Sequence, residues 1–202
     1  MDERLRKQLD FILEVDKSKF VVRQTYLTDG IRKEDDAEHS WHIALMAILL
    51  AEYSNEPVDV LRLVSMLLVH DLIEIDAGDT YAYDENAKKT QHEREKKAAD
   101  RIYGLLPGEQ GRKLYDLWEE FEAQETPEAK FARTMDNIQP MLLNDASGGI
   151  SWKEHNVKLS QILGRNERTH LGSETIWKYA YNNILKKHIQ KGNIIDDVNE
   201  NL

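Results

Sequence analysis

Apolar residues recur at every third or fourth position along most of the chain, and no stretch alternates between apolar and polar residues for long enough to predict a strand. The first predicted helix ends near Lys17, and the second opens around Glu38 or His39. A third helix is predicted to begin at Pro57, because proline is favoured at the first position of a helix, and to end at Gly78. The pattern therefore predicts an all-α bundle.

The second half of the chain continues the helical spacing. Further helices are predicted over residues 85–104, 114–121, 126–142 and 173–191. The third of these has a clear start signal, because Thr126 can act as the cap and Pro127 lies in the first turn. Residues 144–149 form the plainest loop in the sequence, and Ser151 with Glu154 three positions later resembles a capping box for one more helix.

Composition narrows the class of protein. A length of 202 residues suits one well-buried core, and 32% charged residues beside 41% hydrophobic ones are typical of a globular protein. No apolar run is long enough to cross a bilayer and the N-terminal residues lack the apolar core of a signal peptide, so we expect a cytoplasmic protein with no membrane partner.

Cysteine content and net charge exclude several kinds of site. The chain has no cysteine, so disulfides, thiolate zinc sites and cysteine nucleophiles are ruled out, and any metal must be held by histidines and carboxylates. A net charge of -10 argues against a nucleic-acid polymer as partner, because such binding needs a basic surface. A small phosphorylated substrate needs only a few local basic residues and stays compatible with this charge.

His70 and Asp71 form an ionisable pair within an otherwise apolar run, residues 64–74. A divalent cation is one of the few partners that compensates both groups at once. A hydrogen-bonded pair in the core is the structural alternative. His39 lies near a helix start and can be a simple polar end residue. Asp136 lies inside an apolar helix face and can be a salt-bridged surface residue.

Taken together, the four residues favour a metal site, because they come from three helices whose apolar neighbours direct them inward. Two neutral imidazoles and two carboxylates neutralise a divalent cation and leave coordination positions for water and a substrate oxygen, as hydrolysis requires. We expect one ion of Mn2+, Co2+, Zn2+, Ni2+ or Fe2+ as cofactor, with Mg2+ less favoured. The predicted ligands are His39, His70, Asp71 and Asp136.

Further charged residues are candidates for catalysis and substrate binding. Glu74 lies one helical turn beyond His70, and Asp79 directly follows Gly78, so either carboxylate can assist proton transfer. Arg23 lies among apolar residues, where a bidentate guanidinium suits a phosphate group. Arg32, just before His39, adds positive charge there, although an ordinary surface role suits it equally.

The order of these residues resembles a known family. On a helical chain, a histidine is followed by a His-Asp doublet and then by a distant aspartate. This order resembles that of the HD domain of metal-dependent phosphohydrolases, a domain named after its His-Asp doublet. The resemblance covers about residues 15–145. It implies a single HD domain over residues 1–202, with the helices of 151–192 packing on that core.

A closer resemblance links the chain to the branch that contains bacterial 5'-deoxynucleotidases and their eukaryotic relatives. It rests on Glu74 at the end of the motif His-Asp-Leu-Ile-Glu and on Asp79 at the end of the motif Ala-Gly-Asp. It also rests on upstream Arg23 and on His39 between Glu38 and Ser40. The resemblance implies that His39, His70, Asp71 and Asp136 hold the metal, that Arg23 contacts phosphate, and that Glu74 and Asp79 assist catalysis. Gln24 stands where characterised members carry a tryptophan, so the sugar preference does not transfer.

We therefore expect a phosphomonoesterase that acts on a small phosphorylated substrate, a nucleoside or deoxynucleoside 5'-monophosphate. Two-metal HD enzymes place extra histidines between the doublet and the last aspartate, whereas only His92 lies there in this chain. The resemblance therefore implies one metal in place of two and ranks phosphodiesterase or di-iron oxygenase chemistry lower. A non-catalytic nucleotide or metal sensor and a purely structural bundle are the alternatives. The amphipathic terminal helices, with Trp177 and Tyr181 as exposed candidates, suggest a homodimer.

Overall fold

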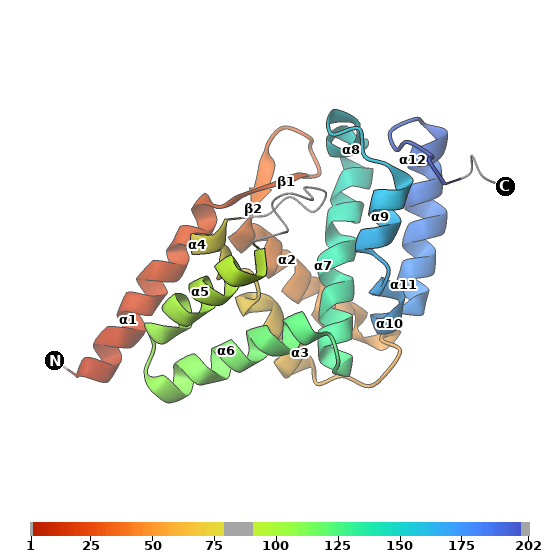
Figure 1. Ribbon diagram of the computed structural model, residues 1–202. Helices are drawn as coiled ribbons and strands as arrows, with labels where there is room; N and C mark the ends of the chain where they lie inside the picture. Colours follow the sequence, from red (N-terminus) through yellow and green to blue (C-terminus); the bar gives the residue numbers. More distant parts are fainter. Residues whose placement is uncertain (1, 79–90, 199–202) are drawn as a thin grey trace.

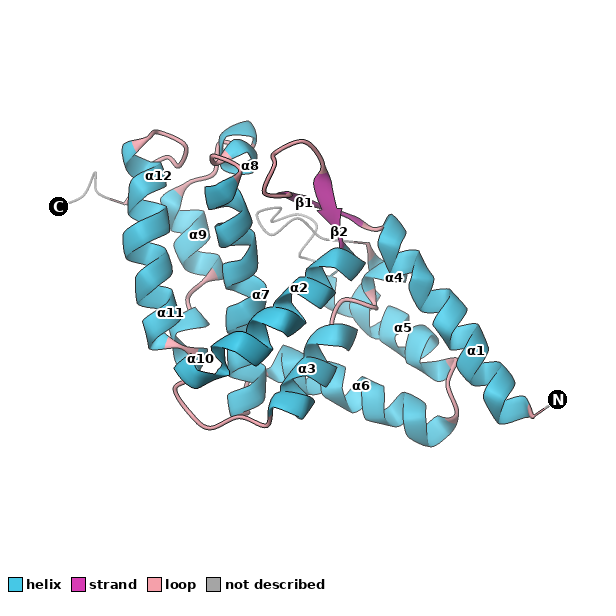
Figure 2. Ribbon diagram, turned by 180° about the vertical axis from the view of Figure 1, so that it is seen from behind, coloured by secondary structure: helices cyan, strands magenta, loops and turns pink. Residues whose placement is uncertain are grey.

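The computed structural model describes residues 2–78 and 91–198, and it is built almost entirely of helices (Figures 1 and 2). The first half contains α1 (Glu3–Val15), α2 (Asp36–Leu50), α3 (Val60–Val69) and α4 (Glu74–Ala77). The second half contains α5 (Gln91–Gly104), α6 (Gly108–Ala123), α7 (Pro127–Ala146), α8 (Ile150–Glu154), α9 (Leu159–Arg165), α10 (Thr169–Gly172), α11 (Glu174–Tyr179) and α12 (Lys186–Gln190). Short 3-10 helices cover Asp16–Phe20 and Ala51–Tyr53, and a π-helical segment, Ala180–Leu185, joins α11 to α12. The predicted all-α class is confirmed. Within the described ranges, no helix combines the length and the apolar character needed to span a bilayer.

A two-stranded sheet is the one element type that the apolar pattern does not predict. Strands β1 (Val22–Tyr26) and β2 (Lys33–Asp35) pair antiparallel, between the end of the first predicted helix and the start of the second. The inward residues of the two strands are ionisable, since Arg23 is 8% exposed and Glu34 is 1% exposed. A strand whose buried face is charged shows no apolar alternation, and this is why the pattern misses it.

Helix α3 is shorter than predicted at both ends. It begins after Asp59, not at Pro57, because the Asp59 carboxylate accepts hydrogen bonds from the backbone N–H groups of Leu61 and Arg62. It ends at Val69, and a turn over residues 70–73 separates it from α4. The His-Asp doublet therefore lies in a turn between two helices and not inside one continuous helix.

Two boundaries in the second half also differ from the prediction. Helix α7 continues to Ala146, into the segment predicted as a loop, and the Asn144 side chain donates to the carbonyl oxygen of Pro140 within its last turns. Helix α8 begins at Ile150, so Ser151 lies inside it and does not cap it. Both corrections lengthen the helical part of the chain.

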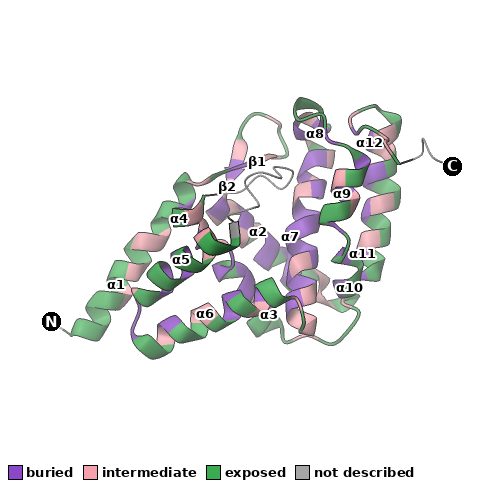
Figure 3. Cartoon of the chain, in the orientation of Figure 1, coloured by how far each residue is buried: buried purple, intermediate pink, exposed green. Residues whose placement is uncertain are grey.

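Helix α7 is the centre of the main core, and Figure 3 shows it mainly in the buried colour with intermediate segments between. Helices α2, α3, α6 and α10 pack against it, and Trp177 and Tyr181, predicted as exposed, lie partly buried against the same core. A smaller cluster between α5, α6 and the turn after α3 includes Ile73 and Trp118. Because α7 carries Asp136, this packing fixes one side of the predicted metal site.

Candidate metal centre

The structure brings all four predicted ligands to one place. His39 lies in the first turn of α2, where the Asp35 cap and Glu38 form a capping box that sets the start of the helix. His70 and Asp71 occupy the turn after α3, and Asp136 lies in the middle of α7. Both histidines and Asp136 are buried, and the Asp71 side chain is 14% exposed.

The four side chains form one cluster of donor atoms. Nε2 of His39 lies 3.2 Å from Oδ1 of Asp136, and Nε2 of His70 lies 3.0 Å from Oδ2 of Asp71. The two pairs are close to each other, because Nε2 of His39 is 3.8 Å from Oδ2 of Asp71 and Nε2 of His70 is 3.9 Å from Oδ1 of Asp136. Donors from three separate segments thus converge on one point.

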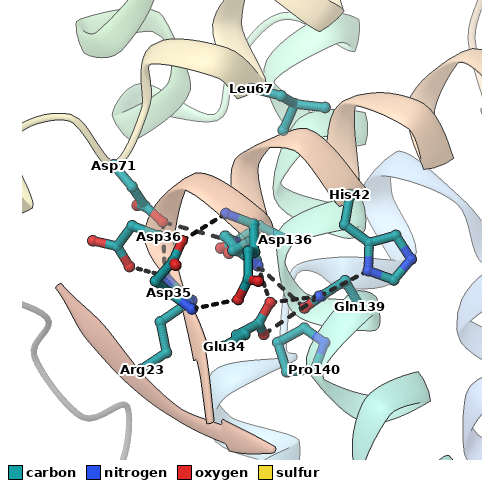
Figure 4. Close-up of polar contacts among 12 residues, drawn as sticks. Arg23, Glu34, Asp35, Asp36, His42, Leu67, Asp71, Asp136, Gln139 and Pro140 are labelled. Carbon is teal, nitrogen blue, oxygen red and sulfur yellow. Dashed lines mark hydrogen bonds and ion pairs between the residues drawn. The ribbon is translucent and has the colours of Figure 1, made fainter. Parts of the chain in front are cut away.

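Hydrogen bonding determines which nitrogen of His39 faces this point. Gln139 donates from its amide nitrogen to Glu34 at 3.0 Å and to Nδ1 of His42 at 3.1 Å, as the labelled network in Figure 4 shows. Its oxygen is left to accept from Nδ1 of His39, 3.1 Å away. The neutral His39 ring therefore carries its lone pair on Nε2, toward Asp136.

The same holds for His70, with a backbone acceptor in place of a side chain. Nδ1 of His70 lies 2.8 Å from the carbonyl oxygen of Leu67, which can only accept, so this nitrogen carries the proton. Nε2 of His70 is buried and makes no hydrogen bond within the described part of the chain. In the neutral ring its lone pair faces the Asp71 carboxylate.

Such an arrangement fits a cation. Two lone pairs of imidazole nitrogens and two carboxylate oxygens repel one another in a buried place, and a divalent ion between them converts this repulsion into coordination. The partners on the far side of each ring, Gln139 and the Leu67 carbonyl, are the kind of contacts that orient histidine ligands. Nitrogen and oxygen donors without sulfur suit the expected divalent transition metals.

The surroundings of His39 and Asp136 keep both side chains in the protonation states that bind a metal. Burial, together with the nearby Arg23 charge, lowers the pKa of His39 to about 4, so this ring is neutral at pH 7. Burial works to raise the pKa of Asp136, but the His39 hydrogen bond and the charges of Arg165 and Arg133 hold it well below its usual range. Asp136 is therefore ionised.

Arg23 lies between two carboxylates. Its Nη1 is 2.8 Å from Oδ2 of Asp71 and 3.1 Å from Oδ1 of Asp36 (Figure 4). Burial and the neighbouring Asp71 raise the pKa of Asp36 to about 7. Sequence reasoning missed Asp36, whose position at a helix start next to other acidic residues indicates only an exposed carboxylate.

A cavity of about 120 Å³ opens beside the cluster. Its lining comprises Arg23, His70, Asp71, Ile73, Glu74, Glu95, Trp118, Phe121, Glu122, Arg133, Asp136 and Arg165. Glu74 thus lines the cavity, with a carboxylate oxygen within 4.8 Å of those of Asp36 and Asp71. Three of the four predicted ligands, His70, Asp71 and Asp136, therefore line this cavity.

Two predicted residues within the described part of the chain, Arg32 and His39, do not line this cavity. Arg32 lies on the surface, where its Nη1 is 2.8 Å from a carboxylate oxygen of Glu38, and it is not among the lining residues. Asp79 falls outside the described residues, so its role stays a prediction.

Arg133 and Arg165 line the cavity although the sequence did not single them out. The position of Arg133 one helical turn before Asp136 was an available signal, whereas Arg165 had none.

Comparisons with known proteins agree with this geometry. The model of the HD domain family matches residues 15–177. A crystal structure of a predicted metal-dependent phosphohydrolase from Magnetospirillum magnetotacticum MS-1 is 45% identical, covers 96% of this chain and 97% of its own, and superposes with a TM-score of 0.91. A conserved hypothetical protein from Pyrococcus furiosus, at 22% identity and a TM-score of 0.60 over 91% of this chain and 97% of its own, shares the fold.

Curated relatives carry a more specific name. A 5'-deoxynucleotidase from Danio rerio is 34% identical over 135 residues, and one from Homo sapiens is 33% identical over 138 residues. The alignments cover 66% and 68% of this chain, respectively. The chain spans 66% of the length of each of these relatives.

Proposed function

Because the chain belongs to the HD domain family, we propose that it is a metal-dependent phosphohydrolase that releases phosphate from a small phosphomonoester, a nucleoside or deoxynucleoside 5'-monophosphate. The observation that carries this proposal is the convergence of the two imidazole Nε2 atoms and the carboxylates of Asp71 and Asp136 beside a cavity. The names of the curated relatives and of the bacterial structure support the substrate class and the reaction type.

We propose that His39, His70, Asp71 and Asp136 hold one divalent ion. When bound, such an ion supplies Lewis-acid polarisation of a phosphoryl group and activation of water at neutral pH. The donor set favours Mn2+, Co2+, Zn2+, Ni2+ or Fe2+ over Mg2+. Gln139 and the Leu67 carbonyl keep both Nε2 atoms directed at this position before any ion arrives.

The other lining residues have complementary roles in the proposed reaction. Arg23 holds the Asp71 carboxylate at 2.8 Å and contributes positive charge toward a phosphate group. The Glu74 carboxylate, in the same cavity, accepts the proton of the attacking water or returns one to the leaving oxygen. Asp79 is the predicted second carboxylate for this proton transfer, and Arg32 is the predicted source of additional positive charge.

A reconstitution assay tests the proposal. The purified protein is stripped with a chelator, reloaded with Mn2+ or Co2+, and assayed for phosphate release from a panel of ribo- and deoxynucleoside 5'-monophosphates. We expect release that depends on the metal and is lost in His70→Ala. His170→Ala is the matched control, because His170 is exposed on α10 and is not among the residues that line the cavity.

Two results would contradict the proposal. Full activity in His70→Ala would contradict the proposed metal-dependent mechanism. Binding of metal and nucleotide with no release of phosphate from any substrate would identify a sensor of the same fold in place of an enzyme.

We further propose that the enzyme is a cytoplasmic homodimer. Support for the dimer comes from α2 and α3, which pack side by side (Figure 2) and carry a row of exposed apolar side chains. The row consists of Trp41, Leu45, Ile48, Leu49, Leu61 and Leu68. Single exposed apolar residues are ordinary, but these six lie at helical spacing on two helices that pack together. Such a concentration is typical of an interface, and a second copy can cover it with its own identical face. A cytoplasmic location agrees with the proposed nucleotide substrate and is tested by cell fractionation.

A further inference from the structure

Two arginines approach Asp136 from the side opposite the histidines. Nη1 of Arg133 lies 3.1 Å from Oδ2 of Asp136, and Nη2 of Arg165 lies 3.8 Å from the same oxygen. The other carboxylate oxygen, Oδ1, faces Nε2 of His39 at 3.2 Å. Asp136 therefore divides its oxygens between the metal cluster and a pair of guanidinium groups.

Arg133 is held in place by several contacts at once. Its Nη2 is 3.0 Å from Glu122, and its guanidinium lies 4.1 Å from the centre of the Phe121 ring. With both ends engaged by carboxylates and one face on an aromatic ring, Arg133 has little freedom to turn toward a ligand. Its role is to position Asp136.

Arg165 is placed differently, although it lines the same cavity. It is the last residue of α9, which lies beside α7 in both views (Figures 1 and 2), and its side chain is 31% exposed. Its contact with Asp136 is longer than a hydrogen bond, and no hydrogen bond to Arg165 side-chain nitrogens is seen within residues 2–78 and 91–198. Its fork of N–H donors is available to a ligand in the cavity.

We propose that Arg165 binds the phosphate group of the substrate and forms, with the metal position, an anion subsite on the Asp136 side of the cavity. This inference rests on the proposed function for the identity of the substrate. Arg23 lines the Asp71 side and Arg165 the Asp136 side, so a phosphate dianion in the cavity next to the metal position lies between two guanidinium groups. An arginine fork matches phosphate oxygens in a bidentate geometry.

The proposal gives the C-terminal helices a part in substrate binding. The sequence assigns the helices of residues 151–192 only a packing role on the core, and Arg165 belongs to that segment. Phosphate recognition by this enzyme then depends on correct seating of α9 beside α7.

Calorimetry with inorganic phosphate on the metal-loaded full-length protein tests the subsite directly. We expect Arg165→Gln to weaken phosphate binding roughly 10- to 100-fold, the usual effect of losing hydrogen bonds to a charged group. Metal content, measured on the same samples, is expected to stay at the wild-type level, because Arg165 donates no ligand atom. Arg165→Lys is expected to restore part of the affinity, since it keeps the charge but not the fork. Arg112→Gln is the matched control, because the Arg112 side chain is 71% exposed on α6 and outside this cavity.

Kinetics with the best nucleotide substrate provide a second readout. Arg165→Gln is expected to raise KM and the inhibition constant of phosphate together. Unchanged phosphate binding in Arg165→Gln, loss of metal that accounts for the whole effect, or no phosphate binding by the wild-type protein would overturn the subsite. Weakened phosphate binding in Arg165→Gln, in a protein that releases phosphate from no tested substrate, would retain the subsite and reject the proposed function.

Discussion

Oε1 of Gln139 lies 3.1 Å from Nδ1 of His39, and this contact directs the other ring nitrogen toward Asp136. Gln139→Leu removes the acceptor and frees the ring to take the wrong tautomer. We expect metal affinity to fall by about 10- to 100-fold, the usual effect of losing such an orienting partner. Competition with a metal-binding dye measures this affinity. Gln110→Leu, which removes only a hydrogen bond from Gln8, is the control and is expected to keep wild-type affinity.

Removing the metal is expected to destabilise the folded protein. An ion that binds only the native state stabilises it by about 2.7 kcal/mol at a free concentration 100 times its Kd. For a chain of this size, that corresponds to a decrease in Tm of about 5–10 °C when a chelator is added. Differential scanning calorimetry measures the shift. His70→Ala should show no shift, and a full shift in that variant would place the ion elsewhere.

Stability should fall as pH rises because of Glu34. Burial raises the pKa of Glu34 from 4.5 to about 7, so between these values the folded protein holds a proton that the unfolded chain has lost. The stabilisation is therefore complete below pH 4.5 and decreases as pH rises toward 7. Glu34→Gln is expected to reduce the loss of stability between pH 5 and pH 8 by about 1–3 kcal/mol in metal-free protein. Urea unfolding at both pH values measures this difference. Glu52→Gln, on the surface, serves as control, and an identical pH dependence of Glu34→Gln and wild type would contradict the expectation.

Gly172 allows α10 to lie directly against α7. A Cβ atom at this position would overlap the backbone carbonyl of Lys130 and the hydroxyl of Thr134. We expect Gly172→Ala to lower the free energy of unfolding by about 1–3 kcal/mol, as overpacking does. Gly164→Ala is the matched control, because a Cβ there meets no atom within 4 Å, and it should gain about 0.5–1 kcal/mol inside α9. Equal stabilities of the two variants in chemical denaturation would show that the close approach is unimportant.

The proposed dimer depends on the apolar face of α2 and α3. Leu49 is 64% exposed on that face, and Leu49→Glu places a charge where a second copy would pack. We expect sedimentation velocity to show a dimer for the wild type and a monomer for this variant. Ile31→Glu is the control, because Ile31 is even more exposed, at 81%, but lies in the turn between β1 and β2. A monomeric wild-type protein would reject the proposed dimer.

The burial of three of the four predicted ligands could be predicted because each of them interrupts an apolar pattern. His70, Asp71 and Asp136 lie in or directly after helices whose other inward positions are apolar, so their burial follows from helical spacing. The order of the ligands along the chain then indicated the family. The helical class was predicted for the same reason, since periodicity alone determines it.

The residues around the cluster could not be predicted in the same way. Glu34 and Asp36 lie in a polar stretch that contains several acidic residues, and nothing in that pattern distinguishes a buried carboxylate from a solvated one. Their burial follows from the pairing of β1 with β2, which is a tertiary contact. Arg165 reaches the cavity only because α9 lies beside α7, and the residues around Arg165 do not indicate this position of the helix.

The two histidines proposed as metal ligands differ in how mutation can change their orientation. The partner that orients His39 is a side chain, Gln139, which a single codon change can replace. The partner that orients His70 is the main-chain oxygen of Leu67, which every amino acid supplies. Natural variants that change metal affinity through ring orientation are therefore expected to act on His39. The orientation of His70 depends on the backbone at the end of α3 and is not expected to change with the side chain at position 67.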